Sequence, residues 1–253
     1  MNIFKKKLED TSPKELNFEP IELFQNLFHK EGYAYLRGIQ EEVLNSWHSI
    51  RDQRDVLCKM NTGSGKTLVS LLMLHSKMIE GVGPSLYLCP DKQLLEQAKL
   101  QADLYGIPVC EIEYQGQRSV FPDDFLNSKA ILLCTFQKLF NSRSIFDRDN
   151  IDVGSIVLDD AHVCLDKARQ ATTINIPFGH ELAERLLKLF NDELKYQAPG
   201  TYHRLTDGDP YAKILKVPYW AWLTRLDELV HLIGEFSEDS ELMFKWGLIA
   251  DDL

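Results

Sequence analysis

The residues best suited to chemistry form the run Met60-Asn61-Thr62-Gly63-Ser64-Gly65-Lys66-Thr67. Gly63 and Gly65 lack a Cβ, so the backbone there can adopt positive φ angles and point successive N–H groups inward. Those amides, with the positive end of a following helix, would form a socket for an anion. Lys66 could reach the β- and γ-phosphates of a nucleotide, and the Thr67 hydroxyl could bind Mg²⁺. The predicted nucleotide phosphate site therefore consists of Thr62, Gly63, Ser64, Gly65, Lys66 and Thr67.

The segments on either side of this loop favour the same interpretation. Asp55–Lys59 is a short apolar run typical of a strand, and Leu68–Leu74 has the spacing of a buried helix. A strand, a glycine-rich turn and a Lys-Thr pair that opens a helix form the context of a phosphate-binding loop. Met60 occupies the first position of the G-x-x-x-x-G-K-T pattern, where the strict form has Gly. The alternative is a loop that is rich in Gly and Ser by chance.

A second group of candidate residues follows the apolar run Ile156–Leu158. Asp159 comes at the tip of this predicted strand, where its carboxylate could bind Mg²⁺ directly or through water. Asp160 follows it and could orient or deprotonate an attacking water. An acidic turn after a strand is the alternative. The metal-binding interpretation is favoured because a phosphate loop lies about 90 residues upstream, with a predicted parallel sheet between.

The elements that must position these residues alternate between strands and helices. Strands are predicted at 84–89, 107–112, 129–134 and 152–158, and helices at 91–104 and 136–140. Such alternation favours an α/β fold with a mostly parallel sheet that is covered on both faces. The phosphate loop then lies at the carboxyl ends of the strands, where such sheets bind ligands.

Apolar spacing predicts further helices towards both ends of the chain. They are one that begins at Pro20, one with Val43, Leu44 and Trp47 on one face, one through 182–194 and one from 218 to 234. Ala198–Gly200 and Asp207–Pro210 have turn chemistry. Because the alternation stops beyond Asp166, we predict two parts. Residues 1–175 form the α/β domain with its N-terminal helical segment, and 176–253 form a mainly helical appendage.

The composition is that of an ordinary globular protein, with 44% apolar and 26% charged residues among 253. No apolar run approaches the ~18 residues of a membrane span. The five cysteines, Cys58, Cys89, Cys110, Cys134 and Cys164, include no C-x-x-C pair, which favours a reducing cytoplasm and argues against a structural zinc site. The net charge of −10, with Lys5–Lys7 as the one basic run, predicts weak nucleic-acid binding by this chain alone.

Residues 60–67 and 159–162 together resemble motifs I and II of superfamily 2 helicases and translocases, the DEAD/DEAH-box-like group. Three weaker matches stand in family order. Leu36–Gln40 resembles the upstream glutamine motif, Leu86–Gln97 resembles motif Ia, and Cys134–Leu139 resembles motif Ib. The order and spacing of all five segments favour the resemblance over chance.

The resemblance implies a three-layer RecA-like P-loop lobe over about 30–165, the first of two such lobes in a motor that couples ATP hydrolysis to movement along nucleic acid. It implies that Lys66 and Thr67 bind phosphate and Mg²⁺, and that Asp159 binds Mg²⁺. Gln40, next to Arg37 in its motif, would read adenine, and His162 would relay the nucleotide state to the second lobe. The residues implied to contact DNA or RNA are Pro90, Lys92, Gln93, Thr135, Gln137 and Lys138.

Two features depart from the family pattern. Asp160 stands where the family has Glu, and a carboxylate set back by about 1 Å can lose on the order of 10²-fold in rate. No Ser-Ala-Thr motif follows motif II, since Ala171–Thr173 comes too soon, and no second lobe supplies an arginine finger. We therefore expect this chain to be the N-terminal portion of a longer protein. Alone, it should bind nucleotide modestly and hydrolyse it little.

Three functions stay open at this point. The first is an ATP-dependent nucleic-acid motor lobe. The second is a nucleotide-binding interaction module without turnover, which Asp160, the acidic charge and the missing second lobe favour. The third is a P-loop NTPase that acts on something other than nucleic acid, against which the motif Ia and Ib matches speak. In the appendage, Tyr219, Trp220 and Trp222 could stack on an unpaired base, but their helical spacing beside Leu223 favours a place in the core.

Overall fold

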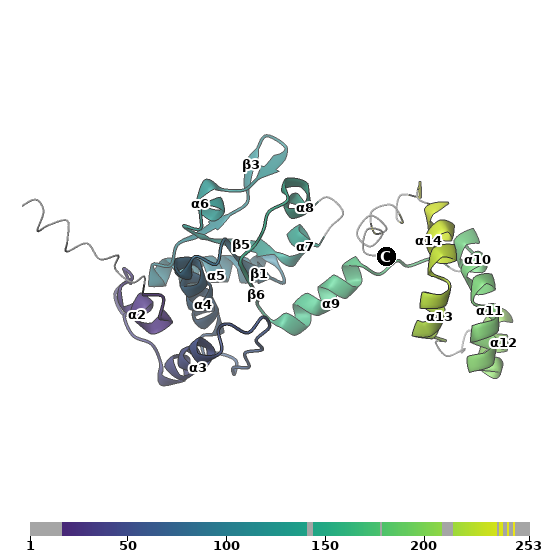
Figure 1. The fold of residues 1–253 in the computed structure, drawn as a ribbon, viewed down its shortest axis with the longest axis horizontal. Coiled ribbons are helices and arrows are strands. Elements are labelled where there is room, and N and C mark those ends of the chain that lie inside the picture. The colour runs from purple at the N-terminus through teal and green to yellow at the C-terminus, as the bar shows by residue number, and fades with distance from the viewer. Residues whose placement is uncertain are drawn as a thin grey trace, which may run out of the picture. The chain divides into compact units, whose positions relative to one another are not determined.

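The computed structural model describes residues 17–140, 144–177, 179–208 and 215–236, with 238, 239, 242 and 245. They fall into two compact units (Figure 1). The first comprises 17–139 and 144–168. The second comprises Phe140 and the described residues from Arg169 on, which is a few residues before the predicted boundary. The basic run Lys5–Lys7 lies outside the described residues. No helix among the described residues is both long and apolar enough to cross a membrane.

A four-stranded parallel sheet forms the centre of the first unit. Its strands are β1 (Ser85–Cys89), β2 (Val109–Glu111), β5 (Ile131–Thr135) and β6 (Ser155–Leu158), in the order β2-β5-β1-β6. Leu88 of β1 pairs with Cys134 of β5 on one side and with Leu158 of β6 on the other. The carboxyl ends of these three strands therefore meet at one edge, and the predicted α/β fold with a parallel sheet is confirmed.

Both faces of the central strands are buried. Helices α4 (Lys66–Glu80) and α5 (Lys92–Tyr105) share one core cluster with a set of alternate strand residues, Tyr87, Cys89, Ile131 and Leu133. The intervening residues Leu86, Leu88 and Leu132 point to the opposite face and are also fully buried. Burial on both faces is the reason that these strands read as continuous apolar runs.

The other helices of the first unit are shorter. They are α2 (Pro20–Gln25), α3 (Gly38–Ser49), α6 (Asp123–Leu126), α7 (Phe136–Leu139), α8 (Ile145–Asp149) and α9 (Ala161–Ala171), the last of which runs on into the second unit. Pro20 occupies the first turn of α2, as predicted, where its missing N–H costs no hydrogen bond. In α3, Leu44 is fully buried, and Val43 and Trp47 pack against the core cluster.

The strand predicted at Asp55–Lys59 is wrong, because these residues form no ladder with any described strand. Leu57 is 87% exposed there.

Strand β6 pairs only with β1 among the described strands, and its Ile156 is 49% exposed. A strand needs the N–H and C=O groups of a neighbour, and an apolar pattern says nothing about whether one lies beside it. The hairpin of β3 (Glu113–Gln115) and β4 (Arg118–Val120) was not predicted.

The second unit is helical, as predicted. Its helices are α10 (Glu181–Leu189), α11 (Asn191–Gln197), α12 (Pro199–Thr206), α13 (Tyr219–Thr224) and α14 (Leu226–Gly234). The two long helices expected here are each divided, at Phe190 and at Arg225. The turn predicted at Ala198–Gly200 is wrong, since Pro199 begins α12, a position in which proline is well tolerated. Asp207 and Gly208 form a turn as predicted, and Asp209 and Pro210 lie outside the described residues.

The core of this unit gathers Leu182, Phe190, Leu194, Tyr202, Leu229 and Leu232. Helix α13 buries only Ala221, so the expectation that its aromatic residues lie in the core is wrong. Tyr219 is 78% and Trp220 is 46% exposed, while Trp222 keeps a ring contact with Phe190 at 4.8 Å. The sequence pattern predicted α13 and α14 as a single amphipathic helix. The break at Arg225 separates α13 from the amphipathic face of α14.

Candidate nucleotide-binding site

The predicted phosphate loop adopts the backbone that its glycines allow. Gly63 has φ +78° and Gly65 has φ +84°, conformations that are costly for residues with a Cβ. Gly65 is the N-cap of α4, so Lys66 and Thr67 open that helix. The turn is closed by Ser64, whose hydroxyl donates to the Asn61 carbonyl oxygen at 2.6 Å. The first amides of a 15-residue helix therefore lie beside the loop, as an anion site requires.

The loop and the strand-end carboxylates line one cavity of about 500 Å³. The predicted residues in its wall are Arg37, Gln40, Thr62, Gly63, Gly65, Lys66, Thr67, Asp159 and Asp160. Lys66 Nζ lies 3.7 Å from Asp160 Oδ1. Asp159 is held at the tip of β6 because its N–H donates to the Leu88 carbonyl oxygen at 2.9 Å. The parallel sheet thus brings together two sequence segments that are far apart in the chain.

The surroundings of Asp159 favour a bound cation. Burial, and to a lesser extent the Asp160 charge, raises the pKa of Asp159 above its ordinary value, although Tyr87 and Lys66 lower it in part. The buried Tyr87 hydroxyl near Thr67 and Asp159 has no hydrogen-bond partner of regular geometry among the described residues. A half-buried carboxylate beside a threonine hydroxyl fits oxygen coordination of Mg²⁺. Thr67 and Asp159 are the residues that would hold the ion.

The side chains of Gln40 and Arg37 form hydrogen bonds with the backbone of the phosphate loop. Gln40 is 4% exposed, and its Nε2 donates to the Ser64 carbonyl oxygen at 3.1 Å while its Oε1 accepts from the Arg37 N–H at 2.9 Å. The Arg37 guanidinium donates to the Gly63 carbonyl oxygen at 3.0 Å. A Cβ on Gly65 would lie 2.2 Å from Gln40 Nε2, so the amide fills the space that the glycine leaves. The adenine-reading role of Gln40 stays a prediction.

Asp160 joins the site to α9. It has φ +47°, a left-handed conformation that Asp tolerates better than most residues. Its carbonyl oxygen accepts from the N–H groups of Val163 and Cys164, so the strained residue also starts the helix. His162 lies in the first turn of α9, exposed and outside the cavity wall. Its role as a relay to a second lobe stays a prediction.

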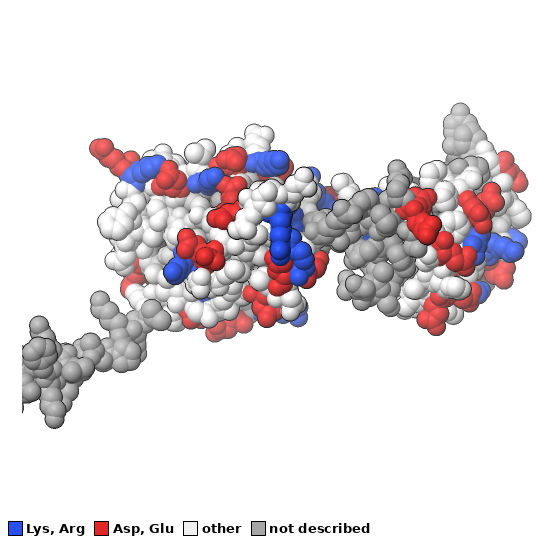
Figure 2. Space-filling model, turned by 90° about the horizontal axis from the view of Figure 1, so that it is seen from above, with Lys and Arg blue, Asp and Glu red and all other residues white. Residues whose placement is uncertain are grey.

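The residues predicted to contact nucleic acid gather at the same edge of the sheet, outside the cavity. Thr135 ends β5 directly opposite Cys89 of β1, and Pro90 follows Cys89. Lys92 and Gln93 are exposed in the first turn of α5, and Gln137 is exposed on α7. Lys138, also on α7, donates to the Tyr114 hydroxyl at 2.7 Å. In the face that Figure 2 shows, basic and acidic side chains are interspersed in both units, without a continuous basic surface.

Sequence reasoning missed part of the cavity wall. Tyr33, Gln97, Gln101 and Tyr105 line it beside the phosphate loop, with Leu94 and Leu104. One signal was available, because Gln97 and Gln101 are one turn apart on a helix that was predicted correctly. The position of Tyr33 depends on the chain between α2 and α3, which has no periodic pattern.

The family model described as DEAD/DEAH box helicase matches residues 37–177, more than half of the chain. The chain belongs to the DEAD/DEAH box helicase family. Among curated proteins, it is similar to the ATP-dependent DNA helicase Hel308 of Pyrococcus abyssi (strain GE5 / Orsay), with 26% identity over 166 residues. That alignment covers 62% of this chain and 22% of Hel308, so the chain spans about a fifth of its relative's length. No solved structure matches the chain.

The part that matches the DEAD/DEAH box helicase family contains both halves of the cavity, from Arg37 through Asp160. The first unit is therefore a helicase-family nucleotide-binding lobe with the α/β RecA-like fold. Most of the second unit lies beyond the matched residues.

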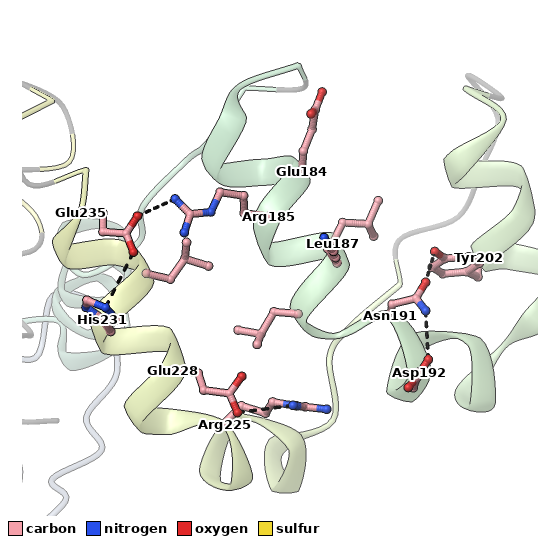
Figure 3. A pocket seen from close by; sticks show the side chains of 13 residues that line it. Glu184, Arg185, Leu187, Asn191, Asp192, Tyr202, Arg225, Glu228, His231 and Glu235 are labelled. Carbon is pink, nitrogen blue, oxygen red and sulfur yellow. Dashed lines mark hydrogen bonds and ion pairs between the residues drawn. The ribbon is translucent and has the colours of Figure 1, made fainter.

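A second cavity, of about 970 Å³, lies in the helical unit between α10 and α14. Figure 3 shows Arg185 directed at Glu235 and Arg225 directed at Glu228. These pairs measure 2.6 Å and 3.4 Å, and His231 Nε2 lies 3.9 Å from Glu235. Much of the charge in this wall is paired within the wall itself, and we assign the cavity no ligand.

Proposed function

We propose that this chain is the ATP-binding first motor lobe of a superfamily 2 helicase or translocase. Joined to a second RecA-like lobe, it would couple ATP hydrolysis to movement on DNA or RNA. The observation that carries the proposal is the shared cavity, in which Lys66 of the phosphate loop lies 3.7 Å from Asp160 at the end of β6. The five cysteines are all free, which suits the reducing cytoplasm that we propose as its compartment.

The residues in the cavity divide the work of phosphoryl transfer. Lys66 and the first amides of α4 bind the β- and γ-phosphates. Thr67 and Asp159 would hold Mg²⁺, which when bound would neutralise charge on the phosphates. Asp160 orients an attacking water and accepts its proton. Because Asp160 is now the neighbour of Lys66, phosphate binding to Lys66 would free that carboxylate for the water.

Three observations support nucleic acid as the polymer along which the motor moves. Pro90 follows β1 and Thr135 ends the adjacent β5, at the same sheet edge as the nucleotide cavity. Lys92 and Gln93 are exposed beside them. The similar protein from Pyrococcus abyssi is named as an ATP-dependent DNA helicase. Because both signs of charge are interspersed and the net charge is −10, we expect firm nucleic-acid binding only with the second lobe present.

The alternative is a nucleotide-binding interaction module with little turnover. It is favoured by Asp160, whose side chain is one methylene shorter than the Glu of the family, and by the net charge of −10. The two proposals make different predictions for hydrolysis, and they make the same prediction for binding.

The experiment is to measure ATP hydrolysis by the protein that carries this chain and its second lobe, with and without single-stranded DNA or RNA. The motor proposal predicts stimulation by nucleic acid and its loss in Lys66→Ala. Binding of ATP and Mg²⁺ without hydrolysis under any of these conditions supports the interaction module. Absence of nucleotide binding contradicts both.

A further inference from the structure

We propose that Tyr87 is a positioning residue for the Mg²⁺ of the nucleotide, with its phenol hydroxyl linking the Thr67 hydroxyl to the Asp159 carboxylate. The proposal rests on the proposed function, because Thr67 and Asp159 are the residues that would hold the ion. It gives a role to a core side chain that the phosphoryl-transfer steps above do not use.

Tyr87 carries a hydroxyl into the core of the sheet. The residue is 0% exposed on β1, between Leu86 and Leu88, and its ring belongs to the core cluster that includes α4 and α5. Burying a hydroxyl without a good hydrogen bond costs free energy that phenylalanine, with nearly the same shape, would avoid. Within the described part of the chain, the Tyr87 hydroxyl has no hydrogen-bond partner of regular geometry. Packing alone therefore does not account for a tyrosine at this position.

The position of this hydroxyl connects it to both halves of the nucleotide cavity. Tyr87 pairs with Val157 of β6, two residues before Asp159. Thr67 lies in the first turn of α4, a helix that shares the core cluster with the Tyr87 ring. Burial is the main cause that raises the pKa of Tyr87, and interactions with Asp159 and Thr67 also act on that pKa. The phenol is therefore near the two side chains assigned to Mg²⁺.

The directions of the two hydrogen bonds suit a metal site. Burial raises the pKa of Asp159, and a hydrogen bond from Tyr87 opposes that rise, as expected when the phenol donates to the carboxylate. Burial also raises the pKa of Tyr87, and a hydrogen bond from Thr67 opposes it, as expected when the Thr67 hydroxyl donates to the phenol oxygen. A phenol can donate and accept at the same time, so the two bonds are compatible.

This relay would prepare both ligands for the ion. An alcohol that binds Mg²⁺ must present an oxygen lone pair to the ion and direct its O–H elsewhere, and the Tyr87 oxygen would accept that O–H from Thr67. The phenol O–H would in turn hold one oxygen of the Asp159 carboxylate. Because Mg²⁺ demands nearly ideal octahedral geometry, ligand orientation matters, and we expect both bonds to become regular when the ion is present. Residues that orient metal ligands in this way contribute about 10- to 100-fold in metal affinity.

The test is calorimetric titration of the chain with ATP, in Mg²⁺ and in EDTA, for wild type and Tyr87→Phe. Wild type should bind ATP roughly tenfold or more tightly in Mg²⁺, and Tyr87→Phe should reduce that advantage by about tenfold. ATP affinity in EDTA should stay the same, because the phosphate loop is intact. Tyr202→Phe is the control, since Tyr202 is also buried but lies in the second unit, where its hydroxyl donates to Asn191. This variant should keep the Mg²⁺ advantage of wild type.

Two further measurements separate positioning from packing. Asp159→Asn should also reduce the Mg²⁺ advantage, and the double variant Tyr87→Phe/Asp159→Asn should lose less than the sum of the separate effects, because Tyr87 acts partly through Asp159. In EDTA without nucleotide, the thermal midpoint of Tyr87→Phe should equal or exceed that of wild type, because the variant removes a buried hydroxyl that lacks a regular hydrogen bond.

The outcomes distinguish this proposal from the proposed function. An unchanged Mg²⁺ advantage in Tyr87→Phe, or full additivity with Asp159→Asn, overturns the positioning role while the nucleotide site stands. Equal weakening of ATP binding in Mg²⁺ and in EDTA, or a lower thermal midpoint in EDTA, assigns Tyr87 a packing role and also overturns the proposal. If wild type binds ATP in neither condition, the proposed function fails as well.

Discussion

Lys66 Nζ and Asp160 Oδ1 lie 3.7 Å apart, across the gap between the phosphate loop and the end of β6. Their side chains are 38% and 40% exposed, and a pair exposed to this degree contributes on the order of 1 kcal/mol or less. Phosphate oxygens can therefore replace Asp160 as the partner of Lys66 at little cost. The pair keeps both groups aimed into the cavity before any ligand binds.

Gly65→Ala should destabilise the chain more than Gly63→Ala does. Both substitutions force a Cβ onto a left-handed backbone, which costs about 1–2 kcal/mol. At Gly63 a Cβ would meet nothing within 4 Å, whereas at Gly65 it would lie 2.2 Å from Gln40 Nε2. Moving that amide breaks its hydrogen bonds, at about 1 kcal/mol each. Urea denaturation of the two variants measures the difference.

A double-mutant cycle tests the cause of this difference. Adding Gln40→Ala to Gly65→Ala removes the clash, so the two substitutions together should cost less than the sum of their separate effects. Equal stability of the Gly63→Ala and Gly65→Ala variants would show that Gln40 does not fill this space.

Asp159→Asn should raise the thermal midpoint of the chain in buffer with EDTA and no nucleotide. Burial raises the pKa of Asp159, so the folded chain carries a disfavoured carboxylate at neutral pH, and Asn removes that charge. The same variant should lose the stabilisation that Mg²⁺ adds to nucleotide. For wild type, ligand at 100-fold its Kd adds about 2.7 kcal/mol. Differential scanning fluorimetry measures both effects, and a lower midpoint in EDTA would contradict this account.

Arg51→Ala should destabilise the first unit by about 2 kcal/mol, the scale of a charged hydrogen bond. Arg51 is 6% exposed in its side chain, and its guanidinium donates to Glu80 at 2.6 Å. It also lies 4.6 Å from the ring centre of Phe18 and 4.9 Å from that of Trp47. Arg54→Ala is the matched control, since Arg54 is 95% exposed and should change stability by less than about 0.5 kcal/mol.

The cost of Arg51→Ala should shrink in acid. Burial alone would raise the pKa of Glu80, but the hydrogen bonds and charges of Lys77 and Arg51 outweigh it and hold that pKa below 4.5. The folded chain then binds fewer protons than the unfolded chain. The stabilisation by the Glu80 carboxylate is therefore present above pH 4.5 and is lost as the pH falls through the lowered pKa of Glu80. Denaturation at pH 7 and pH 4 measures the change. A cost that is independent of pH would exclude Glu80 as the partner that matters.

The parts of the fold that local pattern governs were predictable. Helix α5 follows its N-cap residue Asp91, whose side chain accepts from the Leu94 N–H at 3.0 Å. The phosphate loop was expected near Asp159 and Asp160 at the carboxyl edge of the sheet, and Lys66 Nζ lies 3.7 Å from Asp160 Oδ1, although no described strand precedes the loop. Capping and periodicity are properties of short stretches of sequence.

The parts that depend on distant neighbours were not predictable. Asp55–Lys59 has the apolar pattern of a strand, but whether it pairs depends on what lies beside it. Gln40 was predicted to read adenine, which stays a prediction, but its contact with the Ser64 carbonyl oxygen joins residues 24 positions apart. The exposure of Tyr219 and Trp220 depends on the break at Arg225. None of these facts has a local signal.

The measurement closest to the central claim is calorimetric titration of this chain with ATP in the presence of Mg²⁺. Wild type should bind one equivalent, and Lys66→Ala should bind about 10- to 100-fold more weakly, the value of one charge-assisted phosphate contact. Lys59→Ala, an exposed lysine just before the loop, should match wild type. Equal affinities for wild type and Lys66→Ala would contradict the assignment of this cavity as a nucleotide site.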